Sequence, residues 1–456
     1  MSATGTPAAA PVADPQVRRR EQRGWYFYDW ANSAFVTTVI SVFLGPYLTS
    51  VTQAAAAPGE FVHPLGIPVR AESFFPFVVS VSVIVQVLLL PVVGAFADRS
   101  GRKKALLALC AYAGAAATMG LYFLQGENYL LGGGLFIVAN AAYGSALVVY
   151  YSLLPEIAEP NERDRVSSVG WALGFLGGGL LLLANLAVYQ RHEALGLTAD
   201  EAVRICLLSA GVWWAVFTVI PLRRLRSRTR TPTYPAEPPA GAIAATMRQL
   251  GHTLREARSF PQTLLFLAAF LLYNDGIQTV ATLAPTFGVH ELELDQEIII
   301  VTVLMVQFVA FLGALLLGAL ARVFGARRVV LASLVCWIGV ASVSYFLEVG
   351  AVGQFFALGF VIGLVLGGSQ ALSRSLFSHL VPPRREAEYF SLYQITERGT
   401  TWLGTFLAGI ALQWTGSYRA AILSLLVFFV AGLVLLALVN MRRGIEAVGN
   451  EQPNKV

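Results

Sequence analysis

The stretch that decides the fold is Gly94-Ala-Phe-Ala-Asp98-Arg99-Ser100-Gly101-Arg102-Lys103-Lys104. It separates two long apolar segments, Phe74 to Ala97 and Ala105 to Leu124, and it contains a cluster of positive charges. The glycine at position 101 accepts backbone angles that other residues resist, so the chain can reverse direction there. Because Lys and Arg bias a short loop toward the cytoplasm, the stretch predicts two membrane helices joined by a cytosolic turn.

A second, altered copy of this stretch occurs later in the chain, at Gly318-Ala-Leu-Ala-Arg322-Val-Phe-Gly325-Ala-Arg327-Arg328. It keeps both glycines and the final basic pair, but Arg322 replaces the carboxylate. Two related loops half a chain apart predict a duplicated architecture of parallel halves. The pattern resembles the loop signature between the second and third helices of major facilitator superfamily carriers. That resemblance implies a cytosolic gate, asymmetric because of Arg322, whose residues are Gly94, Asp98, Gly101, Arg102 and Arg322.

The composition places the chain in a lipid bilayer. It has 456 residues, of which 56% are hydrophobic and only 13% are charged, whereas soluble domains have about 25% charged residues. A net charge of +5 can indicate nucleic-acid binding, but here the positive charge lies in short loops, so we expect no nucleic-acid partner. The three cysteines fall inside apolar segments, and we interpret them as packing residues.

Twelve segments approach the length of about 20 apolar residues that a membrane-spanning helix needs. With the N-terminus in the cytosol, about 26 of the 32 Lys and Arg residues fall in cytosolic segments, as expected for twelve spans with both termini inside. We therefore predict an all-α polytopic membrane protein with two pseudo-symmetric six-helix bundles. The predicted spans are 25–51, 74–97, 105–124, 129–155, 166–189, 202–222, 262–288, 296–320, 328–347, 352–379, 389–413 and 419–441.

These spans define five parts of the chain. We expect a disordered cytosolic tail over 1–22, a first bundle over 23–223, and a second bundle over 261–441. A basic, proline-rich cytosolic linker over 224–260 joins the bundles, and 442–456 forms a second cytosolic tail.

Charged residues within the predicted spans are the most informative functional signals, because each costs about 2.5–3.5 kcal/mol at the centre of a helix. Asp29 has two readings: an interfacial residue near the start of the first helix or a functional one. Arg374 and Glu397 should lie at similar depth on adjacent helices, so we predict an ion pair between them, either structural or part of a gate. Arg398 is also charged, but it should point to another face than Glu397.

The seventh span contains Leu272-Tyr273-Asn274-Asp275-Gly276-Ile277-Gln278 near its middle. Asn-Asp-Gly is typical of turns, so we expect the helix to be bent or broken there. Freed backbone groups and polar side chains at this depth suit a substrate site; the alternative is an Asp275 paired with a structural arginine. The residues expected along the substrate and proton pathway are Asp29, Asn32, Asn140, Tyr143, Asn274, Asp275, Gln278, Gln370, Arg374 and Glu397.

Four runs of the sequence together resemble the vacuole-effluxer-like branch of the major facilitator superfamily. They are Tyr28-Asp-Trp-Ala-Asn-Ser33, Leu154-Pro-Glu-Ile-Ala158, Tyr273-Asn-Asp-Gly-Ile-Gln-Thr279 and Gly368-Ser-Gln-Ala-Leu-Ser-Arg-Ser375. The resemblance implies twelve helices, alternating access and no covalent chemistry. For the fungal member that gives the branch its name, it implies export of amino acids from the vacuole.

We therefore predict a secondary active transporter, a permease of the bacterial plasma membrane. Its partners would be the lipid bilayer and a small solute such as an amino acid, with protons as the coupling ion. Two alternatives stay open: an efflux pump for amphipathic drugs, and a membrane sensor that transports nothing. We see no catalytic cluster, phosphate-binding loop or metal-ligand spacing, so we expect no enzyme activity, no cofactor and no metal. We expect a monomer.

Overall fold

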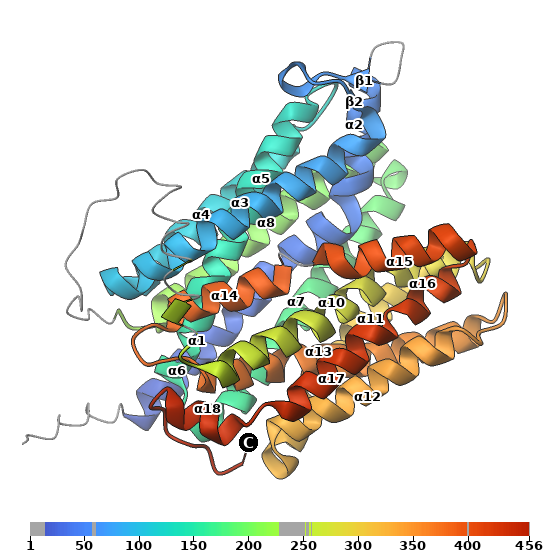
Figure 1. The fold of residues 1–456 in the computed structure, drawn as a ribbon. Coiled ribbons are helices and arrows are strands. Elements are labelled where there is room, and N and C mark those ends of the chain that lie inside the picture. The colour runs from blue at the N-terminus through green and yellow to red at the C-terminus, as the bar shows by residue number, and fades with distance from the viewer. Residues whose placement is uncertain are drawn as a thin grey trace, which may run out of the picture.

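The computed structural model describes residues 14–56, 61–227, 251, 255–256, 258–398 and 401–455, and most of these residues are helical. The helices form two bundles that lie side by side (Figure 1). Both described chain ends contact the same connection in the first bundle: Arg18 pairs with Glu159, and the backbone N–H of Asn454 donates to Asn161 Oδ1 at 2.7 Å. We call this end of the molecule the terminal end.

The first bundle contains six membrane crossings. The first crossing runs without interruption from Pro15 to Ala55 and includes a π-helical segment in its middle. The elements of this bundle are α1 (Pro15–Ala34), η1 (Phe35–Phe43), α2 (Leu44–Ala55), α3 (Ala71–Ser100), α4 (Lys103–Gly120), η3 (Leu121–Phe123), α5 (Tyr129–Ser152), α6 (Leu154–Ile157), η4 (Pro160–Glu162), α7 (Arg163–Gln190), η5 (Glu193–Leu195) and α8 (Ala199–Arg224). Between α2 and α3, β1 (Phe61–Val62), η2 (Pro64–Gly66) and β2 (Val69–Arg70) form a small antiparallel hairpin.

The second bundle contains the other six crossings, followed by a short helix at the terminal end. Its elements are α10 (Pro261–His290), α11 (Gln296–Phe324), α12 (Ala326–Ser344), α13 (Val352–His379), α14 (Glu386–Arg398), α15 (Thr401–Thr415), α16 (Tyr418–Ser424), α17 (Leu426–Leu438) and α18 (Met441–Ala447). Among the described residues, eleven helical segments are long and apolar enough to cross a membrane. The remaining crossing, the eleventh in chain order, comprises α14 and α15.

The expected boundary of the N-terminal tail was wrong. Helix α1 begins at Pro15, not at residue 23, because Asp14 caps it by accepting a hydrogen bond from the backbone N–H of Gln16 and proline fits the first helical position. Gln22 is buried. Helix α18 occupies part of the predicted C-terminal tail. Most of the predicted linker, 228–250, and residues 1–13 lie outside the described residues.

The predicted interruption of the seventh crossing was also wrong. Helix α10 continues through Asn274, Asp275 and Gly276. The eleventh crossing comprises α14, as far as Arg398, and α15, from Thr401; residues 399–400 lie outside the described residues.

Glycines bring neighbouring helices close together in both bundles. Gly359, Gly363 and Gly367 all face α11 from α13, and a Cβ at Gly367 would lie only 2.3 Å from the carbonyl oxygen of Ala310. The spacing of four residues places these glycines on one face of the helix, as the sequence indicates. Small residues at such spacing are the usual means of close helix packing in lipid.

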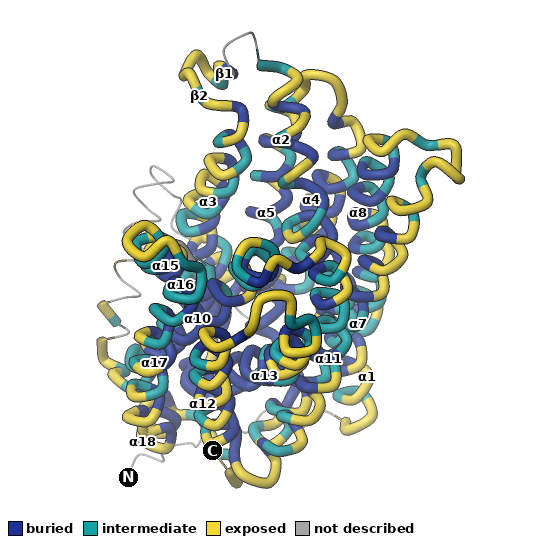
Figure 2. The backbone as a smooth tube through the Cα atoms, turned by 90° about the vertical axis from the view of Figure 1, so that its right-hand side faces the viewer, coloured by how far each residue is buried: buried dark blue, intermediate teal, exposed yellow. Residues whose placement is uncertain are grey.

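The burial pattern agrees with a membrane protein. Figure 2 shows buried residues along the interior of both bundles and exposed residues around the outside. Many of the exposed residues are large and apolar; Leu312 on α11 is 57% exposed and Val335 on α12 is 59% exposed. Such surfaces suit acyl chains rather than water.

The close contact at Gly367 predicts that alanine substitution lowers the stability of the protein there but not at Gly339. Gly367→Ala should lower the unfolding temperature, because the added methyl group forces α13 away from Ala310, with a cost of about 1–3 kcal/mol. Gly339→Ala on α12 is the matched control, since no atom lies within 4 Å of the added Cβ and alanine is the better helix former. Thermal unfolding of both variants in detergent tests this; equal unfolding temperatures would show that the contact does not restrict residue size.

Candidate functional site

A cluster of charges closes the terminal end between the two bundles. Lys103, the first residue of α4, places its Nζ 3.0 Å from Asp98 Oδ1, 2.9 Å from Glu156 Oε1 and 3.2 Å from Glu386 Oε2. Asp98 and Glu156 belong to the first bundle, whereas Glu386 begins α14 in the second. Because one cation faces three carboxylates, the lysine reduces their mutual repulsion and joins the two bundles electrostatically. All four side chains are nearly buried.

Asp98 also binds the start of α14 directly. Its carboxylate accepts hydrogen bonds from the backbone N–H of Ala387 (3.2 Å) and of Glu388 (2.9 Å). The first N–H groups of a helix have no partner within the helix and carry partial positive charge, so a carboxylate is stabilised there. Gly94 permits the approach, because a Cβ at that position would lie 2.6 Å from the carbonyl oxygen of Ala387.

The remaining residues of the predicted gate occupy different places. Gly101 ends α3 with φ 59°, in the left-handed conformation that favours glycine. Arg102 and Arg322 are exposed, and neither belongs to the charge cluster. Sequence reasoning overlooked Lys103, Glu156 and Glu386. The available signal was the doubled base at Lys103 and Lys104, but the sequence alone does not tell which of the two faces inward.

A second connection between the bundles is made by Arg374 of α13. Its guanidinium Nη1 lies 3.1 Å from Asp29 Oδ2 of α1, Nε donates to Ser167 Oγ of α7 at 2.8 Å, and Nη2 donates to the Ser167 carbonyl oxygen at 2.9 Å. Arg374 is fully buried. An arginine from the second bundle is therefore held entirely by groups of the first bundle.

Aromatic rings of the first bundle enclose the same guanidinium. Its central carbon lies 4.7 Å from the ring centroids of Trp25 and Tyr151, 5.5 Å from that of Trp171 and 5.6 Å from that of Tyr150. Cations are attracted to ring faces at such distances, more strongly where water is excluded.

These contacts overturn two expectations. The predicted ion pair between Arg374 and Glu397 was wrong, because Arg374 pairs with Asp29. The interfacial reading of Asp29 was also wrong, since Asp29 is buried between the bundles. Both of its glycine neighbours on α7, Gly170 and Gly174, face it: a Cβ at Gly170 would lie 2.6 Å from Asp29 Oδ2 and 3.1 Å from Arg374 Nη2.

Further hydrogen bonds cross between α7 and α13 toward the terminal end. Ser167 Oγ donates to the Ala371 carbonyl oxygen at 2.6 Å, Ser375 Oγ donates to Asp164 Oδ1 at 2.6 Å, and Arg163 Nη1 donates to the Ser378 carbonyl oxygen at 2.9 Å. Together with the Lys103 cluster and the Arg374 connection, they join the two bundles at this end.

A third polar group surrounds the junction of α14 and α15. Asn274 of α10 donates from Nδ2 to the carbonyl oxygen of Glu397 (3.1 Å) and accepts from Gln370 Nε2 (2.7 Å). The next residue, Asp275, accepts from the backbone N–H of Gly404 (2.6 Å). One donor and one acceptor, adjacent in the chain, thus bind the end of α14 and the beginning of α15. This is why the Asn-Asp-Gly run can remain helical, since its polar side chains bind the neighbouring crossing instead of initiating a turn.

Polar atoms around this junction differ in whether they have a partner within the described part of the chain. Asp275 Oδ1 and Thr279 Oγ1 are buried without a hydrogen-bond partner there. Glu397 Oε2 accepts from Gln394 Nε2 at 2.6 Å. The Arg398 guanidinium lies 4.6 Å from the ring centroid of Tyr143 on α5, so it reaches the first bundle. Arg398 was absent from the predicted pathway, although its charge within a span indicated a role.

The other predicted pathway residues are more dispersed. Asn140 donates to Ser82 Oγ (2.8 Å) and so connects α5 with α3 inside the first bundle. Asn32 is buried on α1, and its Nδ2 has no hydrogen-bond partner among the described residues. Gln278 is partly exposed on α10.

Comparison with known sequences decides the family. The model of the family described as "Vacuole effluxer Atg22 like" matches residues 17–449. The chain belongs to this family. It is 27% identical over 422 residues to the uncharacterized MFS-type transporter YxiO of Bacillus subtilis, covering 92% of this chain and 95% of the relative. It is 25% identical over 542 residues to autophagy-related protein 22-1 of Penicillium rubens, covering 93% and 90%.

Solved structures confirm the fold of this Atg22-like protein. A bacterial homologue of the iron transporter ferroportin, in an outward-facing state, matches with a TM-score of 0.66 and 15% identity over 92% of this chain and 98% of that chain. The proton:xylose symporter XylE matches with a TM-score of 0.65 and 13% identity, covering 92% and 94%. The predicted twelve-helix major facilitator fold is thereby confirmed, and the chain is a secondary transporter in a membrane.

The charge cluster predicts how the terminal end opens. Lys103→Ala should favour the open form, because three buried carboxylates then face one another without a cation; losing one partner of a buried ion pair costs about 3–5 kcal/mol. Maleimide labelling of Ala387→Cys, which is buried beneath Asp98 and Gly94, should be faster in this variant, measured in a chain whose three native cysteines are replaced.

Lys104→Ala is the control, because Lys104 is adjacent, carries the same charge and lies outside the cluster. Equal labelling rates in the two lysine variants would contradict a specific role for Lys103.

Proposed function

We propose that the protein moves a small zwitterionic solute, of the amino-acid class, by alternating access, and that a proton gradient drives it. The observation that carries this proposal is the group of two opposite charges on α14, Glu397 and Arg398. Asn274 of α10 binds the Glu397 carbonyl oxygen, and Arg398 extends to Tyr143 of the other bundle. A zwitterion carries one charge of each sign and is complementary to such a group.

The distribution of Lys and Arg residues indicates how the chain is oriented in the membrane. If the terminal end is cytosolic, about 26 of the 32 Lys and Arg residues are on the cytosolic side, as the positive-inside rule requires. The Lys103 cluster, the Arg374 connection and the bonds between α7 and α13 then all close the cytosolic side. We therefore interpret this conformation as one that admits solute from the opposite side, in the plasma membrane of a bacterium.

Arg398 replaces Arg374 as the proposed partner of the solute carboxylate. All three nitrogens of Arg374 already bind Asp29 or Ser167, and four rings cover its faces. A solute would have to displace the first bundle to reach it. Arg398 lies beside Glu397 on α14; its Nε donates to Gln394 Oε1 (3.2 Å), and its guanidinium contacts the first bundle through the Tyr143 ring. The same argument weakens the drug-efflux alternative, because the aromatic rings around Arg374 cover a cation rather than offering a surface to an apolar ligand.

Asp275 is the proposed proton-binding group. It is 1% exposed, and one of its oxygens has no hydrogen-bond partner among the described residues. It forms no ion pair within the described part of the chain. Burial disfavours the charged form of a carboxyl group that lacks a cation partner, so protonation there can accompany a conformational change.

Asp275→Asn tests the proton-coupling role. The amide oxygen can still accept the hydrogen bond from Gly404, so we expect normal folding, loss of gradient-driven uptake in proteoliposomes, and retained exchange of labelled for unlabelled solute. Asp295→Asn, at the exposed start of α11, is the matched control. Full gradient-driven uptake by the Asp275 variant would remove this residue from the coupling mechanism.

Arg398→Gln tests the solute class. The wild-type protein should prefer an amino acid over its carboxamide by about tenfold or more, since a hydrogen-bonded charge contributes about 1.5–3 kcal/mol. The variant should bind the two ligands equally, as measured by competition in the exchange assay. Arg419→Gln, whose side chain pairs with Glu291 away from the junction, should keep the preference. An unchanged preference in Arg398→Gln would refute carboxylate recognition by this arginine.

A further inference from the structure

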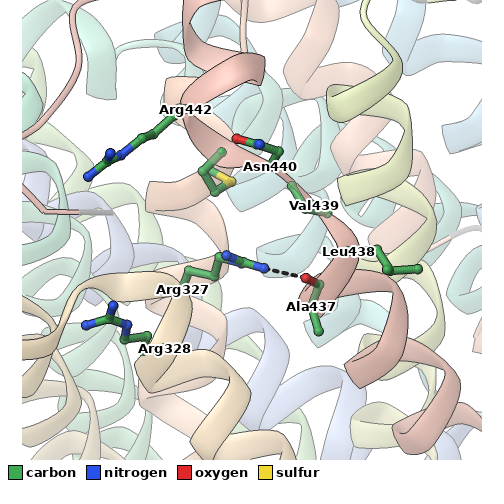
Figure 3. Close-up of a pocket in the computed structure, with 8 residues that line it drawn as sticks. Arg327, Arg328, Ala437, Leu438, Val439, Asn440 and Arg442 are labelled. Atoms are coloured by element: carbon green, nitrogen blue, oxygen red, sulfur yellow. Dashed lines mark hydrogen bonds between the residues drawn. The ribbon is translucent and has the colours of Figure 1, made fainter.

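A basic cavity lies at the terminal end of the second bundle, apart from every residue discussed above as part of the transport path. Its volume is about 370 Å³, and it lies between the start of α12 and the junction of α17 with α18. Figure 3 shows Arg327 and Arg328 on the α12 side and Arg442 at the start of α18. No carboxylate is among the described residues that line it.

The three arginine side chains differ in their hydrogen bonding. Arg327 donates from Nε to the Leu436 carbonyl oxygen (3.3 Å) and from Nη2 to the carbonyl oxygen of Ala437, so it binds the last turn of α17. Arg328 and Arg442 are exposed and have no side-chain partner within the described part of the chain. Two cations beside a third, without a neutralising acid, favour an anion in the cavity.

The electrostatic potential at the start of α12 is also positive. Helix α12 begins at Ala326, so Arg327 and Arg328 lie in its first turn. Free N–H groups and partial positive charge are found at the start of a helix, where anions and not cations are stabilised. The two arginines add to this positive potential instead of offsetting it.

An apolar surface leads away from the cavity along α17. Val427, Val430, Val434 and Leu438 are 65%, 46%, 48% and 64% exposed, and their spacing of three and four residues places them on one face. A shallow groove follows this face from Leu426 to Leu435. Leu438 lines the basic cavity itself, so the apolar surface and the positive charges are continuous.

We propose that this surface binds one anionic phospholipid, with its phosphate between Arg328 and Arg442 and an acyl chain along the exposed face of α17. The combination of charge and apolar surface favours a lipid over free phosphate, which could use only the cavity. The position at the ends of membrane helices is the depth at which headgroups lie.

The test uses the purified full-length protein in detergent with three probes: phosphatidylglycerol, phosphatidylcholine and glycerol 3-phosphate. Native mass spectrometry counts bound molecules, and thermal unfolding measures stabilisation. We expect one retained phosphatidylglycerol and a raised unfolding temperature, with little effect of the other two probes. Each arginine near an anionic headgroup should contribute about fivefold in affinity, so Arg328→Gln with Arg442→Gln should weaken phosphatidylglycerol binding by about 30-fold.

The matched control combines Arg322→Gln with Arg443→Gln, which removes the same charge from exposed neighbours outside the cavity. This control should bind phosphatidylglycerol like the wild-type protein. Equal weakening in both double variants would overturn the site. Equal binding of phosphatidylcholine would overturn the requirement for net negative charge, and equal binding of glycerol 3-phosphate would overturn the role of the α17 surface.

Discussion

The closed end of this transporter depends on one buried cation, Arg374, which belongs to the second bundle but is bound by the first. Asp29 supplies the opposite charge, Ser167 accepts two hydrogen bonds, and four aromatic rings exclude water. Such an arginine is stable only while the bundles remain together, because separation leaves either a buried charge without a partner or a polar surface to be hydrated. The glycine at position 170 leaves the space that the pair occupies.

The need to keep Arg374 buried between the bundles explains why the contacts that close the molecule are concentrated at the terminal end. Lys103 and Glu386 begin their helices, whereas Arg374 lies within α13, and the bonds between α7 and α13 involve the same part of α13. Alternating access requires all of these contacts to break together, at a total cost that the solute and the coupling ion have to offset by binding the other conformation more tightly. The α14 helix connects the closed end to the proposed solute site: its first residues bind Asp98 and Lys103, while farther along the helix the Glu397 carbonyl oxygen binds Asn274 and Arg398 contacts Tyr143. A shift of α14 would therefore change contacts at the closed end and at the proposed solute site.

The sequence predicted the features that depend on local chemistry or on a periodic pattern. The spans, the turn at Gly101 and the close packing through Gly359, Gly363 and Gly367 are of this kind. One error is local, since the capping residue Asp14 and the proline that begin α1 were overlooked. The others concern contacts between distant parts of the chain. Arg374 was paired with Glu397 because those helices are consecutive, yet its partner Asp29 belongs to the other bundle, and sequence spacing contains no information about which faces meet there. Asn274 and Asp275 were read as a turn because of their propensity, but Asn274 Nδ2 binds α14 and one carboxylate oxygen of Asp275 binds α15, and α10 remains intact.

The most direct test of the account measures the separation of the bundles at the terminal end. Spin labels at Arg102→Cys and Arg322→Cys, exposed positions on the two bundles, should give a single short distance in the wild-type background with the native cysteines replaced. Arg374→Met keeps an unbranched side chain but removes the guanidinium, so a second, longer distance should appear and dominate; Asp29→Asn should produce the same shift to a smaller extent. An unchanged short distance in a folded Arg374→Met protein would contradict the claim that this arginine holds the bundles together.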